Sequence, residues 1–405
     1  MAMTHEVAIL AGADGFRLDT WDRYEVSLSM TQPGTPWTVT LFRSRRAESA
    51  WDRVWRALRL GDPMAFSIDG AVQMNGAIEE VTDGSDPDQG DTLTVSGRDL
   101  SGPALRWDAD PRVRLKGLTL EEAMQRLFAP LGIAVRVGED VDSTREVQLG
   151  TARNRRARRS TRPRRHPVDL SRPQPGEKVW QVADALCRRF GYLLWVAPHP
   201  EQGLSVAVDV PAYTDAARFE LRRRYHPDRG PGEERYTDDT NILRATRRVS
   251  VRDVPTEVTV YTGSARGASL SSRSTQTLLN AGMFDETVNG GVRINTALQH
   301  PMHIRAQRAR TPAAARQTAQ RAINDAMRGF RTYTCALQGH GQRQRDGRVR
   351  LYAVNTMARV IDDGRSMDEP MLIQDLTFRG DAEAGSLTEL TLGPVGAIVL
   401  TPEDP

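Results

Sequence analysis

Several features that define common protein classes are scarce or missing in this sequence. Its 405 residues include only 2 cysteines, Cys187 and Cys335, which excludes a disulfide framework and predicts two buried free thiols. No apolar run reaches the roughly 18 residues that a membrane-spanning helix needs, so we expect no membrane insertion. The first residues do not form a basic segment followed by an apolar one. We therefore expect a chain that is made and assembled in a cytoplasm.

Sequence motifs of catalysis and metal binding are missing too. We find no nucleophile elbow, no His-Glu-x-x-His, no P-loop and no glycine-rich dinucleotide loop. His300 and His303 lie close together, but no acid or cysteine follows at ligand spacing. The acidic segment 83–91 lacks the terminal glutamate of a calcium loop, and the acidic segment 362–369 flanks a predicted turn. We therefore predict no catalytic, cofactor-binding or metal-binding residues and no enzymatic activity.

Positive charge is concentrated in one segment. The net charge is +3, yet Arg153–Arg165 holds eight arginines and no acid, so the rest of the chain carries about −5. Clustered arginines attract nucleic-acid phosphates, but no aromatic residues are interleaved to stack on bases. An arm that binds an acidic protein surface is a second interpretation. A solvated loop is the third, and the composition favours it because the segment has almost nothing to bury.

A strand pattern occurs twice in the chain. Near the C-terminus, apolar residues alternate along Met371–Phe378 and return along Leu387–Leu392, which predicts antiparallel strands with one buried face. The same order of strand, turn, strand, acidic loop and strand occurs near the N-terminus. There, segments 37–42, 64–70, 76–82 and 92–96 match segments 333–337, 357–364, 371–377 and 387–392. We infer two related β-domains, one at each end of the chain.

The middle of the chain indicates two small α+β modules. Each has a helix with its apolar residues on one face and then short strands, within 118–137 and within 177–208. The predicted fold is α+β and mainly β, with two related antiparallel β-barrel-like domains at the chain ends and the two modules inserted between them. The predicted boundaries are 1–105, 106–152, 153–175 for the arginine-rich connection, 176–240, and 241–405 with a helix at 312–330. We also expect a helix over 47–58 and a surface loop over 263–280.

Several segments, taken in order, carry a resemblance to a known family. They are Leu93–Leu100, Gly176–Leu194, Asn241–Leu243, His300–Ile304 and the C-terminal strands 353–360, 371–373 and 387–392. Together they resemble the baseplate hub proteins of contractile-tailed phages of the Mu-like and P2-like type. Those proteins are distantly related to the T-even hub and to the base of type VI secretion spike proteins. The resemblance covers most of the chain.

The resemblance implies a structural protein of the virion, located in the tail baseplate. It implies a homotrimer that forms a pseudo-six-fold ring, adapts the hexameric tail tube to the trimeric spike, and continues the tail channel. The implied partners are other copies of the chain, the spike protein, the tube protein and, on the outer surface, baseplate wedge proteins. DNA is implied only as cargo in the channel, with Arg153–Arg165 outside it. The alternative is a tail-associated nucleic-acid-binding or cell-wall-degrading protein.

Overall fold

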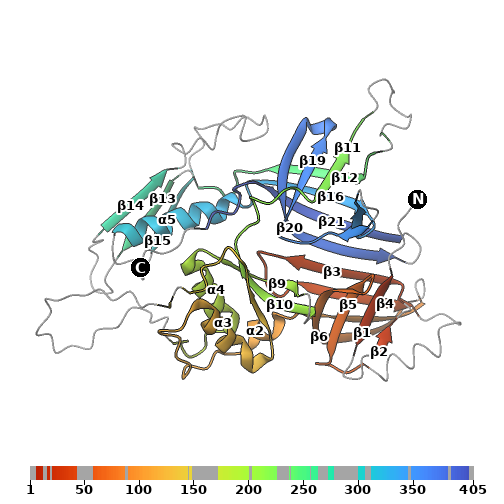
Figure 1. Cartoon of the computed structure of the whole chain (residues 1–405), viewed down its shortest axis with the longest axis horizontal. Helices are drawn as coiled ribbons and strands as arrows, with labels where there is room; N and C mark the ends of the chain where they lie inside the picture. The colour runs from red at the N-terminus through yellow and green to blue at the C-terminus, as the bar shows by residue number, and fades with distance from the viewer. Residues whose placement is uncertain are drawn as a thin grey trace, which may run out of the picture.

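The computed structural model describes residues 6–400 except 12–15, 19–20, 43–57, 87–89, 145, 148–171, 200–202, 226–236, 238, 256, 263–271, 278–299, 306–311, 345–347 and 382–384. Strands make up most of the described chain (Figure 1), which confirms the predicted mainly-β α+β fold. The expected helix over 47–58 falls almost entirely outside the described residues, and the arginine-rich segment 153–165 falls wholly outside them.

In the described part of the chain, most strands belong to one 13-stranded sheet of order β12-β16-β21-β20-β3-β4-β7-β6-β5-β1-β2, with β19 beside β20 and β11 beside β19. The N-terminal strands are β1 (Val7–Ala11), β2 (Phe16–Leu18), β3 (Arg23–Ser29), β4 (Pro36–Phe42), β5 (Pro63–Ile68), β6 (Ala71–Asp86) and β7 (Gly90–Asp99). The C-terminal strands are β11 (Phe219–Arg223), β12 (Ile242–Val249), β16 (Arg331–Gln338), β19 (Thr356–Asp362), β20 (Met367–Asp381) and β21 (Gly385–Pro394). A separate pair is β17 (Gly341–Arg343) and β18 (Val349–Leu351).

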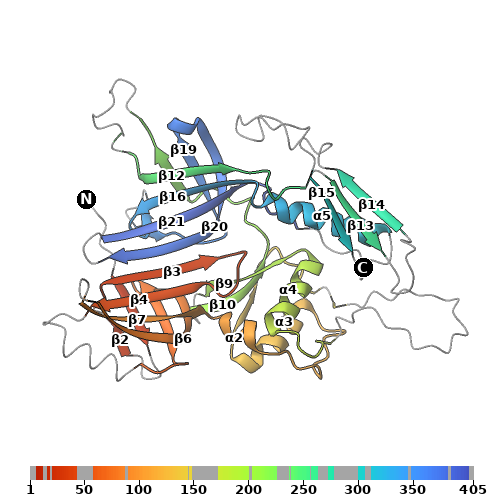
Figure 2. The ribbon, with the colours of Figure 1, turned by 180° about the vertical axis from the view of Figure 1, so that it is seen from behind.

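The two halves of this sheet repeat one strand order. The N-terminal half runs β3-β4-β7-β6-β5 and the C-terminal half runs β12-β16-β21-β20-β19, and neighbouring strands are antiparallel in both. The repeat predicted from the sequence is therefore present in the topology. The halves are also joined, because β3 pairs with β20, and Figure 2 shows the C-terminal strands above the N-terminal strands.

The repeat extends to single residues. β6 is bulged against β7 between Ile78 and Glu80, and β20 is bulged against β21 at the corresponding place, after Ile373. Counted from the bulges, Gly90 corresponds to Gly385, the first residue of the next strand in each half. Both glycines have a positive φ, 78° and 82°, a conformation that glycine adopts without strain.

One rung of the repeat shows how the two cores diverged. In the C-terminal half Tyr333 stands opposite Leu392, and the corresponding rung of the N-terminal half has Trp37 opposite Gly97. A Cβ on Gly97 would lie 2.0 Å from the Ala77 carbonyl oxygen and 2.9 Å from the Trp37 ring. Both the backbone of β6 and the indole therefore leave room only for glycine at this position, where the other half has a leucine.

The segments predicted as two α+β modules share one sheet. β8 (Val135–Val137), from the first, pairs in parallel with β10 (Gly203–Asp209), and β10 pairs antiparallel with β9 (Leu193–His199). Helix α3 (Leu120–Phe128) begins with a capping box formed by Thr119 and Glu122. It lies against α4 (Val179–Phe190) and β8, and α2 (Gly102–Arg106) also contacts α4. Neither segment alone has enough strands to bury a helix, which explains why they combine.

A third unit is inserted between β12 and β16. Its sheet has the order β14-β13-β15, formed by β13 (Glu257–Thr262), β14 (Ser272–Thr277) and β15 (Pro301–Arg305), and α5 (Pro312–Met327) packs on it. Its apolar cluster is separate and contains Val254, Val258, Val260, Ala319, Ile323 and Phe330. The strand at 257–262 is thus outside the large sheet, and part of the expected loop over 263–280 is the strand β14.

Candidate assembly surfaces

The joint between the two halves is the ladder of β3 and β20, which runs from Asp375 opposite Ser29 to Asp381 opposite Arg23. On one face its contacts are polar, including an ion pair at 2.9 Å between Arg23 and Asp381. The other face is buried and contains Tyr24, Val26 and Leu28 of β3 and Leu376 and Phe378 of β20. The joint therefore combines a backbone ladder with an apolar core, and it holds the two halves as one body.

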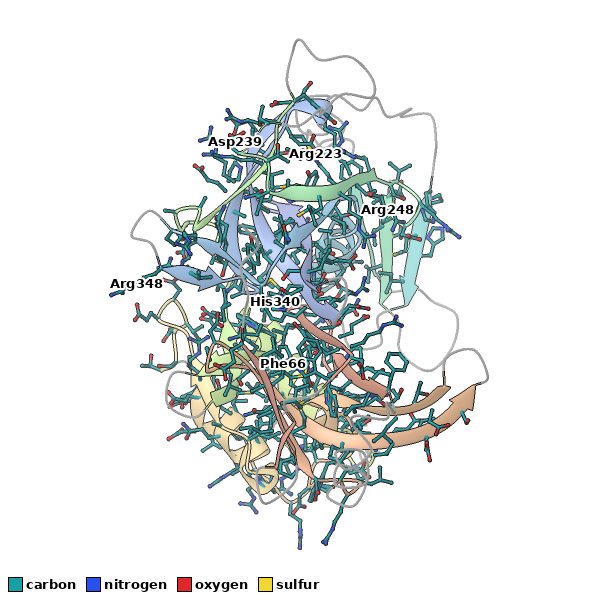
Figure 3. The ribbon with its side chains drawn as sticks, turned by 90° about the vertical axis from the view of Figure 1, so that its right-hand side faces the viewer. Phe66, Arg223, Asp239, Arg248, His340 and Arg348 are labelled. Carbon is teal, nitrogen blue, oxygen red and sulfur yellow. The ribbon has the colours of Figure 1, made fainter. Side chains whose placement is uncertain are left out.

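A buried series of hydrogen bonds crosses this joint at His340, which lies close to Phe66 of the N-terminal half in Figure 3. The Tyr24 hydroxyl lies 2.5 Å from Nε2 of His340, and Nδ1 of His340 lies 3.0 Å from the Thr388 hydroxyl. Because Thr388 donates to the Gly339 carbonyl at 2.7 Å, it accepts from Nδ1–H, and Nε2 then accepts from Tyr24. Burial also raises the pKa of Tyr24, which keeps the donor protonated. The side chains of Tyr24, His340 and Thr388 thus each have a hydrogen-bond partner in this series.

Gly380 allows the Tyr24 ring to lie in the joint. The two residues stand opposite each other in the ladder. A Cβ on Gly380 would lie 2.0 Å from Cε1 and 2.3 Å from Cζ of the tyrosine ring. The ring in turn packs against Phe66, which stacks on Phe378 of β20. Side chains from both halves therefore interlock around one glycine.

The C-terminal half closes on itself through an asparagine. β11 pairs in parallel with β19, and Asn241, at the start of β12, reaches β11. The Asn241 backbone N–H donates to the Arg222 carbonyl at 2.9 Å, and its side chain accepts from the Arg222 N–H at 2.7 Å and donates to the Glu220 carbonyl at 2.8 Å. The amide takes the place of a strand rung, so the strands from β12 to β11 come round in a barrel-like arrangement.

Arg365 links the far part of β12 to the same closure. It lies in a short 3₁₀ turn, η3 (Asp363–Arg365), between β19 and β20, as expected for the acidic segment 362–369. Arg365 donates to the Ala245 carbonyl at 2.6 Å and to Oδ2 of Asp362 at 2.8 Å, and the Tyr333 hydroxyl donates to the same oxygen at 2.8 Å. Asp362 is fully buried. Its carboxylate is therefore a structural anion rather than half of a catalytic acid pair.

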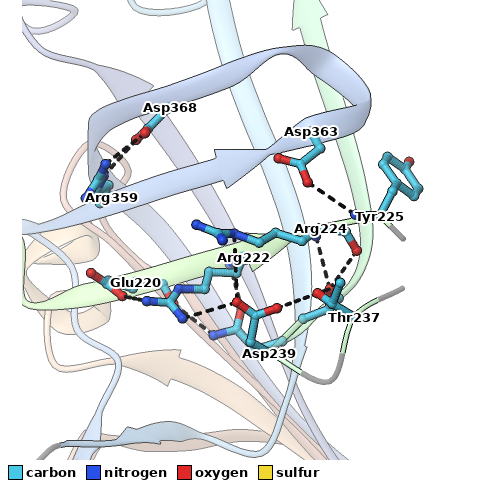
Figure 4. A network of polar contacts seen from close by, with 11 residues as sticks. Glu220, Arg222, Arg224, Tyr225, Thr237, Asp239, Arg359, Asp363 and Asp368 are labelled. Carbon is cyan, nitrogen blue, oxygen red and sulfur yellow. Dashed lines mark hydrogen bonds and ion pairs between the residues drawn. The ribbon is translucent and has the colours of Figure 1, made fainter. Parts of the chain in front are cut away.

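A cluster of charged side chains covers the surface around β11 and the β19–β20 turn (Figure 4). Arg222 and Arg224 approach Oδ2 of Asp239 at 3.3 and 3.8 Å, and Arg359 donates twice to Asp368, at 2.7 and 2.8 Å. The hydrogen bonds from Arg359 lower the pKa of Asp368. These side chains are 33–52% exposed, so the cluster adds little to stability and presents a charged surface instead.

Two strands of the large sheet, β6 and β12, each have an edge of several residues that no other strand pairs with in the described chain. Residues 80–86 of β6 pair with β7, whereas β5 pairs only with residues 71–77. β12 pairs with β16 along its length. On its other side Asn241 reaches β11 and Arg365 donates to the Ala245 carbonyl, so among the described residues the edge lacks a strand partner from residue 246 onward. Unpaired N–H and C=O groups along such edges can accept another strand. These edges are the candidate surfaces for assembly.

The structure places the histidines and cysteines that the sequence singled out. His300 and His303 lie at the start of β15 and are exposed, and among the described residues no three histidine, cysteine or acidic side chains are grouped to hold an ion. Cys187 and Cys335 are buried free thiols, as predicted. β6 and β7 form the hairpin expected around segment 83–91. Within the described residues, no helix has the length and apolarity to cross a bilayer.

Comparison with known proteins places the fold among phage tail proteins. No family model and no curated protein matches the sequence. A tail protein from Neisseria meningitidis MC58 has a TM-score of 0.68 and 20% identity, with 98% of both chains covered. The 43 kDa tail protein of prophage MuSo2 from Shewanella oneidensis has a TM-score of 0.68 and 18% identity over 97% of this chain and 99% of that one. A chain of a Francisella PdpA–VgrG complex is more distant, with a TM-score of 0.53, 8% identity, and coverage of 100% of this chain and 60% of that one. The fold expected from the resemblance is confirmed.

Sequence reasoning missed the residues that build the joint and the closure. Tyr24 and His340 lie 316 positions apart, and no local pattern connects them. Asn241 was singled out only within the segment Asn241–Leu243, which carries part of the resemblance, and Gly380 was not singled out. The repeat was the one available signal. Because the two halves have the same strand order, a strand edge that lies open in one half corresponds to a strand edge in the other half.

Proposed function

We propose that this chain is a structural baseplate hub protein of a contractile tail, without enzymatic activity. Three copies form a homotrimeric ring with pseudo-six-fold symmetry, which adapts the hexameric tail tube to the trimeric central spike and continues the tail channel. The observation that carries the proposal is the strand order repeated within one chain. Three chains with two like halves present six like faces, which suits a six-fold tube on one side and a three-fold spike on the other.

The comparisons support the class of this proposal. Two tail proteins share the fold over nearly their whole length, and the fold also occurs in a complex that contains a VgrG protein. We propose the spike protein and the tube protein as axial partners, baseplate wedge proteins as partners of the outer surface, and DNA as passing cargo. The proposed location is the virion baseplate, after assembly in the host cytoplasm.

Mass measurement in solution tests the ring. The chain has a mass of 45.0 kDa, so a trimer has a mass of about 135 kDa. We expect light scattering to give the trimer mass at high protein concentration, and imaging of assembled tails to show three-fold density between tube and spike. A monomer at every concentration, together with assembled tails that lack such density, contradicts the proposal.

A further inference from the structure

The joint between β3 and β20 has a counterpart in the repeat, and the two strands of that counterpart do not meet within one described chain. The C-terminal part of β20 pairs with β3. In the repeat, β6 corresponds to β20 and β12 corresponds to β3, yet in the described chain these two strands do not pair with each other. We propose that β6 of one copy pairs with β12 of the next copy, in the register that the joint inside the chain already uses. This inference rests on the proposed function, since it identifies the surfaces that build the ring.

The repeat fixes the register of the proposed ladder. From the shared bulge, residues 80–86 correspond to residues 375–381. Val39 and Cys335 occupy the same rung of the repeat and stand opposite Tyr24 and Ala245, so residues 23–29 correspond to residues 244–250. Transferring the pairing of β20 with β3 gives these rungs between copies: Glu80 with Ser250, Val81 with Val249, Thr82 with Arg248, Asp83 with Arg247 and Gly84 with Thr246. The ladder ends there, because the carbonyl of the next residue, Ala245, accepts a hydrogen bond from Arg365 inside the chain.

The two edges have opposite charge in this register. The β6 edge carries Glu80 and Asp83, and the β12 edge carries Arg247 and Arg248. In the transferred register Asp83 stands opposite Arg247. Opposite charges on facing strands stabilise a ladder and reject other registers.

Exposure of the two edges agrees with a partner that is absent from a single chain. The side chains of Glu80, Thr82 and Asp83 are exposed, and so is that of Arg248. Inside the chain, the residues that correspond to Val81 and Asp83 are Leu376 and Phe378. They stand opposite Leu28 and Val26 of β3, and both are fully buried. The same strand position is therefore covered in one half and uncovered in the other.

The geometry also limits how many copies pair. The contact is head-to-tail, since β6 of each copy meets β12 of the next, and such contacts close a ring when the rotation divides a full turn. If the rotation that relates the C-terminal half of one copy to the N-terminal half of the next equals the rotation that relates the two halves within a copy, all halves follow one another around a pseudo-six-fold axis. Three chains then use every β6 and every β12, and none of these edges is left open to further copies.

A cysteine pair tests the register directly. The residues that correspond to Thr82 and Arg248 are Thr377 and Ser27, whose hydroxyl oxygens lie 3.0 Å apart across the joint inside the chain. In the double variant Thr82→Cys, Arg248→Cys, we expect oxidation to give covalent trimers in a denaturing gel, because the two sulfurs face each other at every contact between copies. The native thiols, Cys187 and Cys335, are buried and do not interfere.

A control with the wrong register makes the test specific. In Thr82→Cys, Thr246→Cys, both cysteines sit on the same two edges but two residues out of register, and we expect few crosslinks. Trimers in solution that crosslink in neither variant, or equally in both, overturn this inference while the proposed ring stands. A chain that remains monomeric overturns both. In the charge-reversed variant Asp83→Arg, the protein concentration needed to form the trimer should rise at least tenfold. Adding Arg247→Asp should lower that concentration again in part.

Discussion

Replacing Gly380 by alanine should weaken the joint between the two halves by about 3 kcal/mol. The added Cβ would lie 2.0 Å from Cε1 of the Tyr24 ring, far inside van der Waals contact. The ring cannot swing away cheaply, because its hydroxyl is bonded to the buried His340 and its faces pack against Trp21 and Phe66. Overpacking of cores costs about 1–3 kcal/mol, and a rigid neighbour places this site at the upper end.

The assay is chemical denaturation of the purified chain, read as a shift of the midpoint at constant slope. Gly329→Ala is the matched control, because a Cβ there would meet nothing closer than 4.0 Å. A second arm uses Tyr24→Leu, which removes the ring atoms that alanine would strike. In that background we expect Gly380→Ala to cost less than about 1 kcal/mol. An equal cost with and without the tyrosine, or a Gly380→Ala midpoint like that of the control, refutes the interlocking of the halves.

Two further predictions concern aspartates, the half-buried Asp375 and the fully buried Asp362. Burial raises the pKa of Asp375, which accepts a hydrogen bond from Ser29, so its contribution is fully present below the unfolded pKa and is lost as pH rises through the folded pKa. Asp375→Asn should therefore gain stability relative to wild type between pH 4 and pH 7 in thermal melts, and a constant difference contradicts this. Arg365→Ala should cost roughly 3–5 kcal/mol because it leaves the fully buried Asp362 without its cation. The exposed Arg359→Ala is the control, and the same loss in both variants speaks against the closure.

Patterns of period two made the repeat visible in the sequence. The apolar alternation along β20 and β21, and the equivalent segments of β6 and β7, predicted strands, hairpins and their order, because each alternation reports one buried face. The helix stripes of α3 and α4 were equally clear, and a capping box fixed the start of α3. What these patterns report is local, and they were most reliable where the partner of a strand is its neighbour in the chain.

Long-range pairing could not be read from the same patterns. Alternation shows that a strand has a buried face, but it does not show which strand lies beside it. The pairing of β3 with β20, the sheet shared by β8 and β10, and the separate sheet around β13 all join segments that are far apart or interrupted. The buried residues of the joint, such as His340, carry no sequence signal because their partners are set by topology.

The difference between the two kinds of edge follows from when each one is formed. β3 and β20 belong to one chain, so they meet during folding and can expose apolar side chains such as Val26 and Phe378 only briefly. In the proposed ring, β6 and β12 meet a partner only when copies collide, so a folded chain would carry both edges in water until then. Charged residues such as Asp83 and Arg247 keep these edges soluble and prevent pairing with the wrong strand. The same charges attract in the proposed register, so a duplicated fold can bury Val26 and Phe378 in one joint and place Arg247 and Asp83 at the corresponding positions of the other.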